Sequence, residues 1–197
     1  MFTKTQIRIM KVFVANIIRR FSIKEIADTL KSPYPLIHRS IQDLLKGGFI
    51  AKDEKDFLSL NYKGNNTELV YIEALRAKDS TIKENKLSLF INDVLERVKE
   101  DFFVFLIFGS YVEKLTYRDI DFLFIIEDES RVNEIERTLE NIADNFTNKI
   151  EIQVISVKSA HEMLSNRDKV NIMNETLNKH ILLFGTENYY RMIKNAR

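Results

Sequence analysis

The sequence of 197 residues contains no cysteine and no tryptophan, and only two prolines and five glycines. Without cysteine the chain forms no disulfide, uses no thiolate nucleophile and offers no cysteine ligands for zinc. It also lacks an apolar run of membrane-spanning length and an N-terminal signal peptide, so we expect a cytoplasmic protein without a membrane partner. A hydrophobic content of 45% indicates a folded chain that buries one or two compact cores.

Charge is distributed unevenly along the chain. Residues 1–64 contain 12 Lys and Arg against six Asp and Glu, a net charge of +6, whereas the remainder carries a net charge of −5. Such asymmetry indicates a polyanionic partner for the N-terminal part. We predict two domains, residues 1–64 and 85–197, joined by a helical connector over residues 65–84.

Two helices are predicted at the N-terminus. Apolar residues recur at helical spacing between Ile7 and Ile18. A second helix is predicted to begin after Ser22, an N-cap residue whose capping-box partner is Glu25, three residues later.

A third helix is predicted to begin at Ser32 and Pro33, because proline is favoured in the first turn after a capping serine, and to end at Gly47-Gly48. Its predicted buried face consists of Leu36, Ile37, Ser40, Ile41, Leu44 and Leu45. Residues 49–51 and 57–60 flank a charged turn and are typical of a β-hairpin. Three helices followed by a hairpin predict a winged helix-turn-helix domain.

Residues 23–27 (IKEIA) and 44–50 (LLKGGFI) resemble the winged helix domains of bacterial and archaeal transcriptional regulators. In that geometry the third helix enters the major groove of duplex DNA. The resemblance implies that bases or phosphates are contacted by Tyr34, His38, Arg39 and Gln42 on this helix and by Lys52 and Lys55 on the wing. It also implies a homodimer that matches two half-sites. The alternative is a module that only dimerises or packs against a partner, with solvated basic residues, because the charge excess is modest.

Two apolar strands are predicted in the acidic part, at residues 102–108 (FFVFLIF) and 120–126 (IDFLFII). The turn Gly109-Ser110 follows the first. Asp119 and Asp121 stand at the start of the second and point to the same side, because side chains alternate across a strand. We predict an α/β (α+β) fold, with a mixed sheet flanked by helices.

A third acid belongs to the predicted strand at residues 149–155 (KIEIQVI), reached through a crossover helix. Alternation places Glu151 and Gln153 on one face, and the isoleucines and Val154 on the other. Three acids on neighbouring strands suit a pair of divalent cations that hold a triphosphate. Gly109 and Ser110 would approach its phosphates through backbone N–H groups and the serine hydroxyl.

These residues resemble the minimal nucleotidyltransferase domains of the DNA polymerase beta superfamily. Gly109 and Ser110 match the phosphate-binding turn of that family, Asp119 and Asp121 its metal-binding pair, and Glu151 the acid on the next strand. Residues 181–185 (ILLFG), with Glu187, resemble its closing strand and turn.

The resemblance implies transfer of a nucleoside monophosphate, AMP from ATP, to a hydroxyl acceptor, with two Mg²⁺ ions held by the three acids and Glu151 as a candidate base. A protein acceptor such as a HEPN-type toxin is implied by antitoxin relatives. Other relatives use small molecules or RNA ends.

The loop between Ser110 and Asp119 departs from the family pattern. It is shorter, lacks a second glycine, and carries Glu113, Lys114 and Arg118, the last in place of a serine. Lys114 and Arg118 are either solvent-facing or contacts for the triphosphate, and Arg118 is a candidate for nucleotide binding.

The departures favour an alternative function: a DNA-binding regulator whose second domain binds nucleotide or a partner without turnover. The alternative for the three acids together is a set of solvated charges at strand ends. Taken alone, Gly109 suits a strand end and Ser110 a helix cap. The enzyme hypothesis requires the three acids to gather, with no basic side chain held where the cation belongs.

Overall fold

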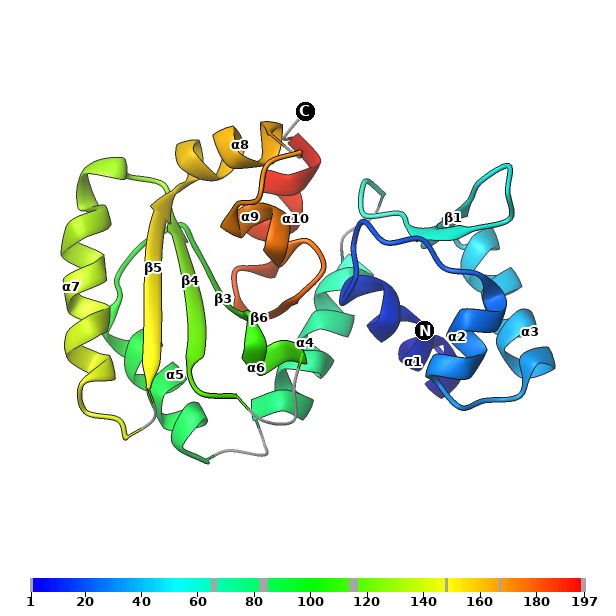
Figure 1. Cartoon of the computed structure of the whole chain (residues 1–197), viewed down its shortest axis with the longest axis horizontal. Helices are drawn as coiled ribbons and strands as arrows, with labels where there is room; N and C mark the ends of the chain where they lie inside the picture. Colours follow the sequence, from blue (N-terminus) through cyan, green and yellow to red (C-terminus); the bar gives the residue numbers. More distant parts are fainter. Residues whose placement is uncertain are drawn as a thin grey trace. The chain divides into compact units, whose positions relative to one another are not determined.

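The computed structural model describes residues 2–64, 67–81, 85–113, 117–147, 149–166 and 168–195. Its contacts divide the chain into two compact units, Met1–Glu73 and Ala74–Arg197. Figure 1 shows that the first is mainly helical with a small hairpin, whereas the second is built around a larger sheet. Within the described ranges, no helix combines the length and the apolar character needed to cross a lipid bilayer.

The first unit consists of three helices followed by an antiparallel hairpin, in the order that the sequence predicts. Its elements are α1 (Lys4–Val14), α2 (Ile23–Thr29), α3 (Tyr34–Lys46), β1 (Ile50–Lys52) and β2 (Leu58–Leu60). In the hairpin, Ile50 pairs with Leu60, and Lys52 with Leu58. The buried core includes Phe13, Ile26 and Ile37, one from each helix. A further helix, α4 (Thr67–Thr81), begins in this unit and ends in the second.

The predicted capping box at the start of α2 is confirmed. Ser22 Oγ accepts a hydrogen bond from the Glu25 N–H at 3.2 Å, and the Glu25 carboxylate accepts one from the Ser22 N–H at 2.7 Å. The prediction that Ser32 caps α3 is wrong. Pro33 occupies the N-cap position without a side-chain hydrogen bond, and the Ser32 hydroxyl donates to the Leu30 carbonyl instead.

Helix α3 ends at the predicted glycines. Gly48 adopts a positive φ of 72°, its N–H donates to the Leu45 carbonyl, and the Phe49 N–H donates to the Leu44 carbonyl. This is the Schellman arrangement, which a glycine accommodates at low cost. The face predicted as buried is wrong at Leu36, which is 45% exposed.

Helix α1 is shorter than the apolar spacing predicts, because it ends at Val14 and not near Ile18. The side chain of Asn16 donates to the Val12 carbonyl at 2.9 Å. That bond gives the backbone an alternative to another helical turn. Ile17 still joins the core, whereas Ile18 is 43% exposed.

The second unit contains a four-stranded mixed sheet in the order β5-β4-β3-β6. Its strands are β3 (Phe103–Phe108), β4 (Ile120–Ile126), β5 (Ile150–Ser156) and β6 (His180–Phe184). β3 pairs antiparallel with β4 and β6, whereas β4 pairs parallel with β5 through the predicted crossover helix α7 (Val132–Ala143). The central strands β3 and β4 are buried on both faces, as predicted, apart from Asp121.

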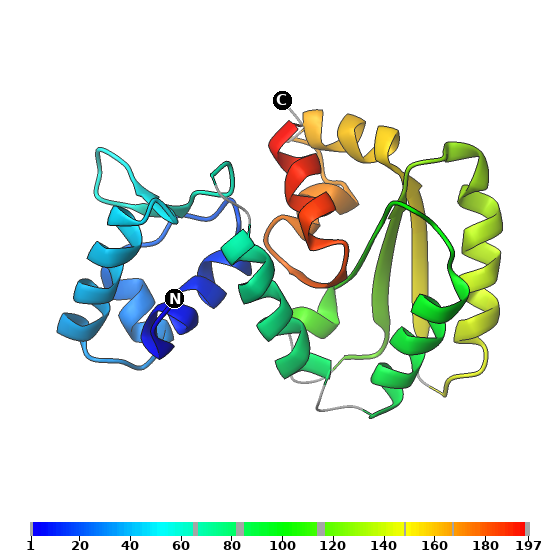
Figure 2. The same cartoon turned by 180° about the vertical axis from the view of Figure 1, so that it is seen from behind.

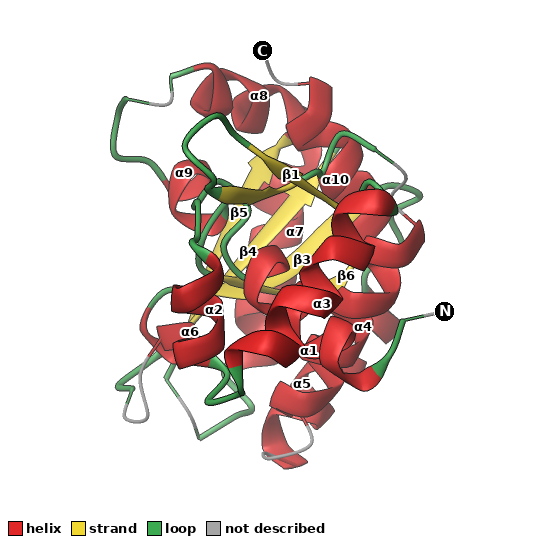
Figure 3. Ribbon diagram, turned by 90° about the vertical axis from the view of Figure 1, so that its right-hand side faces the viewer, coloured by secondary structure: helices red, strands yellow, loops and turns green. Residues whose placement is uncertain are grey.

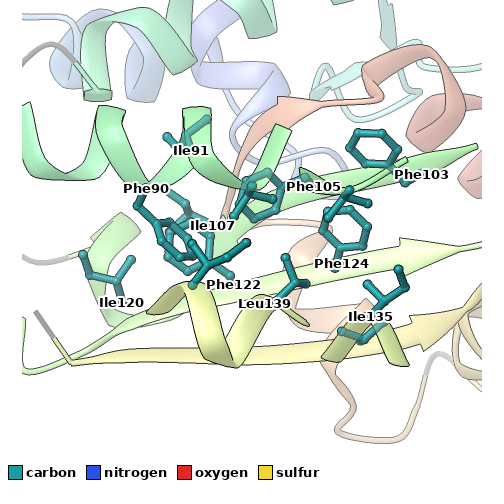
Figure 4. Packing of buried hydrophobic residues seen from close by; sticks show 14 of the residues in the cluster. Phe90, Ile91, Phe103, Phe105, Ile107, Ile120, Phe122, Phe124, Ile135 and Leu139 are labelled. Carbon is teal, nitrogen blue, oxygen red and sulfur yellow. The ribbon is translucent and has the colours of Figure 1, made fainter. Parts of the chain in front are cut away.

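Helices cover both faces of this sheet. On one face, α7 lies beside α5 (Asn85–Arg97), as the reverse view in Figure 2 shows. In Figure 4 the rings of Phe90, Phe105 and Phe122 meet there, with 4.8 Å between the centroids of Phe90 and Phe122. The other face is covered by α8 (Val157–Ser165), α9 (Ile172–Thr176) and α10 (Thr186–Asn195). Figure 3 draws the strands of this sheet in yellow and the helices in red.

Candidate functional site

The acids predicted from the two strand patterns lie at the end of the sheet where β4 and β5 begin. Asp121 and Glu151 are each the second residue of their strand and are Cα partners in the parallel register. Asp119 lies one residue before β4, so alternation places it on the same face as Asp121. This face is the one that α8, α9 and α10 cover. The fold therefore brings Asp119, Asp121 and Glu151 to one corner of the sheet.

Gly109 follows β3 and lies against Asp121. Its φ is +69°, a region in which only glycine is free of steric cost. A Cβ at this position would overlap Asp121 Oδ2. Gly109 therefore does more than end a strand, because it lets the backbone pass directly beside a carboxylate. Ser110, which is half-buried, then begins the four-residue helix α6 (Ser110–Glu113).

A basic side chain lies among the acids. Lys149 Nζ forms an ion pair with Glu151 and lies 3.5 Å from Asp119 Oδ2. The side chains of Lys149 and Glu151 are 64% and 51% exposed. The Lys149 ammonium pairs with carboxylate oxygens that would otherwise coordinate a metal ion. Its position is therefore evidence against a preformed metal centre.

The acids produce an excess of negative charge that Lys149 does not cancel. The pKa of Asp121 is raised, first because burial disfavours the charged carboxylate and then because Asp119, Glu151 and Glu175 repel it. The Lys149 ammonium acts in the opposite direction. The pKa of Lys149 is itself raised, chiefly by its hydrogen bond to Glu151. Three neighbouring carboxylates thus act on Asp121 against one ammonium, which itself pairs only with Glu151 and Asp119.

The chemistry of these donors fits a hard divalent cation such as Mg²⁺, which prefers carboxylate oxygens. Burial is the first cause of the raised pKa of Asp121, and the repulsion from Asp119, Glu151 and Glu175 that follows it is a contribution that a nearby positive charge would relieve. The carboxylates are nevertheless not arranged as a complete metal site. In the described part of the chain, no group of three His, Cys, Asp or Glu side chains could hold a metal ion. The two Mg²⁺ ions and the ATP substrate stay predictions.

Two members of this cluster were not predicted. Lys149 has a sequence signal, because it stands two residues before Glu151 and strand alternation directs both side chains to one face. Glu175 has none, because it belongs to α9, which only the tertiary fold brings near Asp121.

Of the loop residues, Arg118 is exposed, and the structure gives its guanidinium no ion pair with any residue that it describes. Lys114 lies outside the described residues. A triphosphate contact by Arg118 therefore stays a prediction.

The residues predicted to bind DNA share the exposed side of α3. Tyr34 is 50% exposed, His38 and Arg39 are exposed, and Gln42 is half-buried. The rings of Tyr34 and His38 lie 5.9 Å apart, one helical turn from each other. Ile37 and Ile41 anchor the opposite side of the helix in the core.

The wing carries less free positive charge than its sequence indicates. Lys52 Nζ lies 2.5 Å from Asp56 Oδ1, so an adjacent carboxylate offsets its charge. Asp53 shapes the turn by accepting hydrogen bonds from the N–H groups of Lys55 and Phe57, both at 2.9 Å. The Lys55 side chain is exposed at the tip of this turn.

Comparisons with known proteins leave this chain without a family assignment. No protein-family model matches it, and no curated protein matches it. Among solved structures, IclR of Thermotoga maritima is 19% identical, with a TM-score of 0.29, over 54% of this chain and 40% of its own. An IclR homologue from Microbacterium sp. strain HM58-2 is 15% identical, with a TM-score of 0.30, over 60% and 44%. The chain thus spans less than half of either protein, and likenesses this small carry no functional argument.

Proposed function

We propose that the second unit is a metal-dependent nucleotidyltransferase that moves a nucleoside monophosphate, AMP from ATP, to a hydroxyl acceptor and releases pyrophosphate. The observation that carries the proposal is the register of β4 and β5, which pairs Asp121 with Glu151 beside the positive-φ turn at Gly109. Asp119 completes the set on the same face. Phosphoryl transfer depends on charge neutralisation and positioning, for which such a corner of the sheet is suited.

Lys149 stands where the enzyme hypothesis requires no basic side chain, so the proposal depends on replacement of its ion pairs by a metal ion. Exposed ion pairs contribute only about 0–1 kcal/mol, since solvent screens them and long side chains lose entropy on pairing. Lys149 is more exposed than either of its partners. The binding free energy of a divalent cation with two or three carboxylate ligands exceeds this small stabilisation. The cation can therefore displace the Lys149 ammonium without a movement of the backbone.

Each residue then has a distinct task. When bound, Mg²⁺ would neutralise the phosphates and lower the pKa of the attacking hydroxyl. Asp119, Asp121 and Glu151 are the residues that would hold it. Gly109 keeps the turn close to Asp121, and Glu151 is the candidate to accept the proton of the acceptor hydroxyl.

The test is transfer of label from α-labelled ATP in the presence of Mg²⁺ and extracts or purified neighbours that contain acceptors. The parent chain should label an acceptor, whereas Asp119→Ala and Asp121→Ala should not. Asp101→Ala, which removes an exposed acid away from the corner, is the matched control. Equal labelling by the parent and both aspartate variants would refute the proposal.

A second candidate function is a regulator whose second unit binds nucleotide or a partner without turnover. The observation that favours it is Lys149, which already supplies a cation to Glu151 and Asp119. A regulator of this kind would bind ATP equally well with and without Mg²⁺ and would release no pyrophosphate. Measuring both quantities on the same preparation separates the two functions.

We propose that the first unit binds duplex DNA through the exposed side of α3. Its support is the net charge of +6 over residues 1–64, together with the exposure of Tyr34, His38 and Arg39. Phosphate contacts make such binding weaken as salt rises. Failure to bind any duplex at low salt would leave this unit as a module for protein contacts, and the homodimer would lose its rationale.

A further inference from the structure

The first unit contains a pocket whose lining includes none of the residues predicted to contact DNA. It has a volume of about 510 Å³ and is lined by residues of α1, α3 and α4 and by Phe2 and Phe49. Small-molecule sites commonly have volumes of this order, with apolar walls and a few polar groups that orient the ligand.

The walls are aromatic. Phe2 and Phe49 meet edge to face with 4.8 Å between their ring centroids, and Tyr71, which also lines the pocket, is 49% exposed. An exposed tyrosine beside two phenylalanines leaves ring faces available to a ligand. Aromatic faces attract cations as well as apolar groups.

The charged groups of the pocket are acidic. Asp43 and Glu68 line it, and none of the described residues in its lining carries a positive charge. Gln6 donates to Asp43 Oδ2 over a long 3.4 Å, so this carboxylate keeps capacity to accept another hydrogen bond.

The Glu68 carboxylate indicates a ligand independently of the shape and the aromatic walls of the pocket. Its Oε2 atom is shielded from solvent and has no hydrogen-bond partner among the described residues. A buried acceptor without a partner is costly, and the cost is larger when the group carries a charge. A donor that enters the pocket would remove this cost.

We infer that the pocket is a binding site for a small organic cation, namely an ammonium group attached to an aromatic or apolar body. The ammonium donates to Glu68 and lies near Asp43, and the body packs among Phe2, Phe49 and Tyr71. Asp43 lies one turn after Arg39 on α3, so the ligand contacts the same helix that carries the candidate DNA-binding side chains.

The test uses the full chain and three probes of matched shape: 2-phenylethylamine, 2-phenylethanol and 3-phenylpropanoate. Binding is measured by calorimetry, and its location by chemical-shift changes of the amides around Tyr71. The amine should bind saturably at millimolar concentration or below and at least about tenfold more tightly than the alcohol, and the carboxylate should not bind.

Substitutions then assign the contacts. Glu68→Gln keeps the shape of the side chain and should weaken amine binding at least about tenfold. Tyr71→Ala should also weaken it, and because Tyr71 is exposed, circular dichroism should show an unchanged fold. The control is Glu54→Gln, an exposed acid on the wing outside the pocket lining. The inference is overturned if the amine does not bind, if the amine and the alcohol bind equally, or if Glu68→Gln binds the amine like the parent.

Discussion

At the scale of single residues, the corner of the sheet depends on the close approach of Gly109 and Asp121. A carboxylate packed against a glycine with positive φ leaves no room for another side chain. Burial raises the pKa of Asp121, and repulsion from the neighbouring acids raises it further. The charged form of Asp121 is therefore disfavoured at this corner.

Gly109→Ala should destabilise the protein by at least about 2 kcal/mol, because it combines the cost of a positive φ with steric overlap. The free energy of unfolding in urea measures the effect. In the Asp121→Ala background, where the overlapping carboxylate is absent, the cost should fall to about 1 kcal/mol. An equal cost in both backgrounds would show that Asp121 does not limit this position.

Asp121→Asn should raise the melting temperature at pH 7. Because the pKa of Asp121 is raised in the folded protein, folding favours the protonated carboxyl, and stability is lost as pH rises from the unfolded pKa through the folded one. The difference between variant and parent should vanish below about pH 3, where both states are protonated. Thermal unfolding across the pH range measures it.

Asp128→Asn is the matched control with the opposite sign. Ser130 hydrogen bonds lower the pKa of Asp128, which caps the short 3-10 helix Glu129–Arg131. This carboxylate contributes stability above its unfolded pKa and loses it as pH falls. The variant should melt below the parent at pH 7. A shift of the same sign for both variants would contradict the charge distribution described here.

At the scale of elements, the sequence was most informative where local rules decide the structure. Ser22 with Glu25, the stop at Gly47-Gly48 and the apolar run of β4 all follow from short-range chemistry, and the structure confirms them. The prediction of Ser32 as a cap was wrong because its hydroxyl donates a hydrogen bond to the Leu30 carbonyl. The prediction of Leu36 as a core residue was wrong because its side chain lies on the exposed side of α3.

Features that depend on contacts between distant parts of the chain could not be predicted from the sequence. Alternation along β5 separates Glu151 and Gln153 from Ile150 and Ile152, but Ile155 shares the face of Glu151, contrary to the prediction for the isoleucines. The proximity of Glu175 to Asp121 depends on the docking of α9, which no short pattern encodes.

Ser22→Ala should destabilise the protein by about 1 kcal/mol, because it removes a cap from the first turn of α2. Ser32→Ala is the control at the next helix, where the serine does not cap, and its cost should be no more than about half as large. Urea unfolding of the two variants measures both. A larger cost at Ser32 would restore that residue as the cap of α3.

At the scale of the whole molecule, the chain joins a basic unit with an exposed helix face to an acidic unit with a carboxylate corner. The proposed partners of the two units differ, a polyanion for the first and a cation-bound nucleotide for the second. Arg39→Ala should weaken binding to duplex DNA several-fold and lower its salt dependence, because a phosphate contact releases counterions. Lys194→Ala, in the acidic unit, should leave binding unchanged, and fluorescence anisotropy at several salt concentrations measures both. Equal losses in the two variants would point to non-specific attraction.

Titration of the full chain with Mn²⁺ measures whether the corner of Asp119, Asp121 and Glu151 exchanges the Lys149 ammonium for a divalent cation. The parent should bind saturably, Asp121→Asn should lose most of this affinity, and Lys149→Met should bind up to about fivefold more tightly, the equivalent of about 1 kcal/mol. Equal binding by all three proteins, or no binding by either the parent or Lys149→Met, would contradict the account.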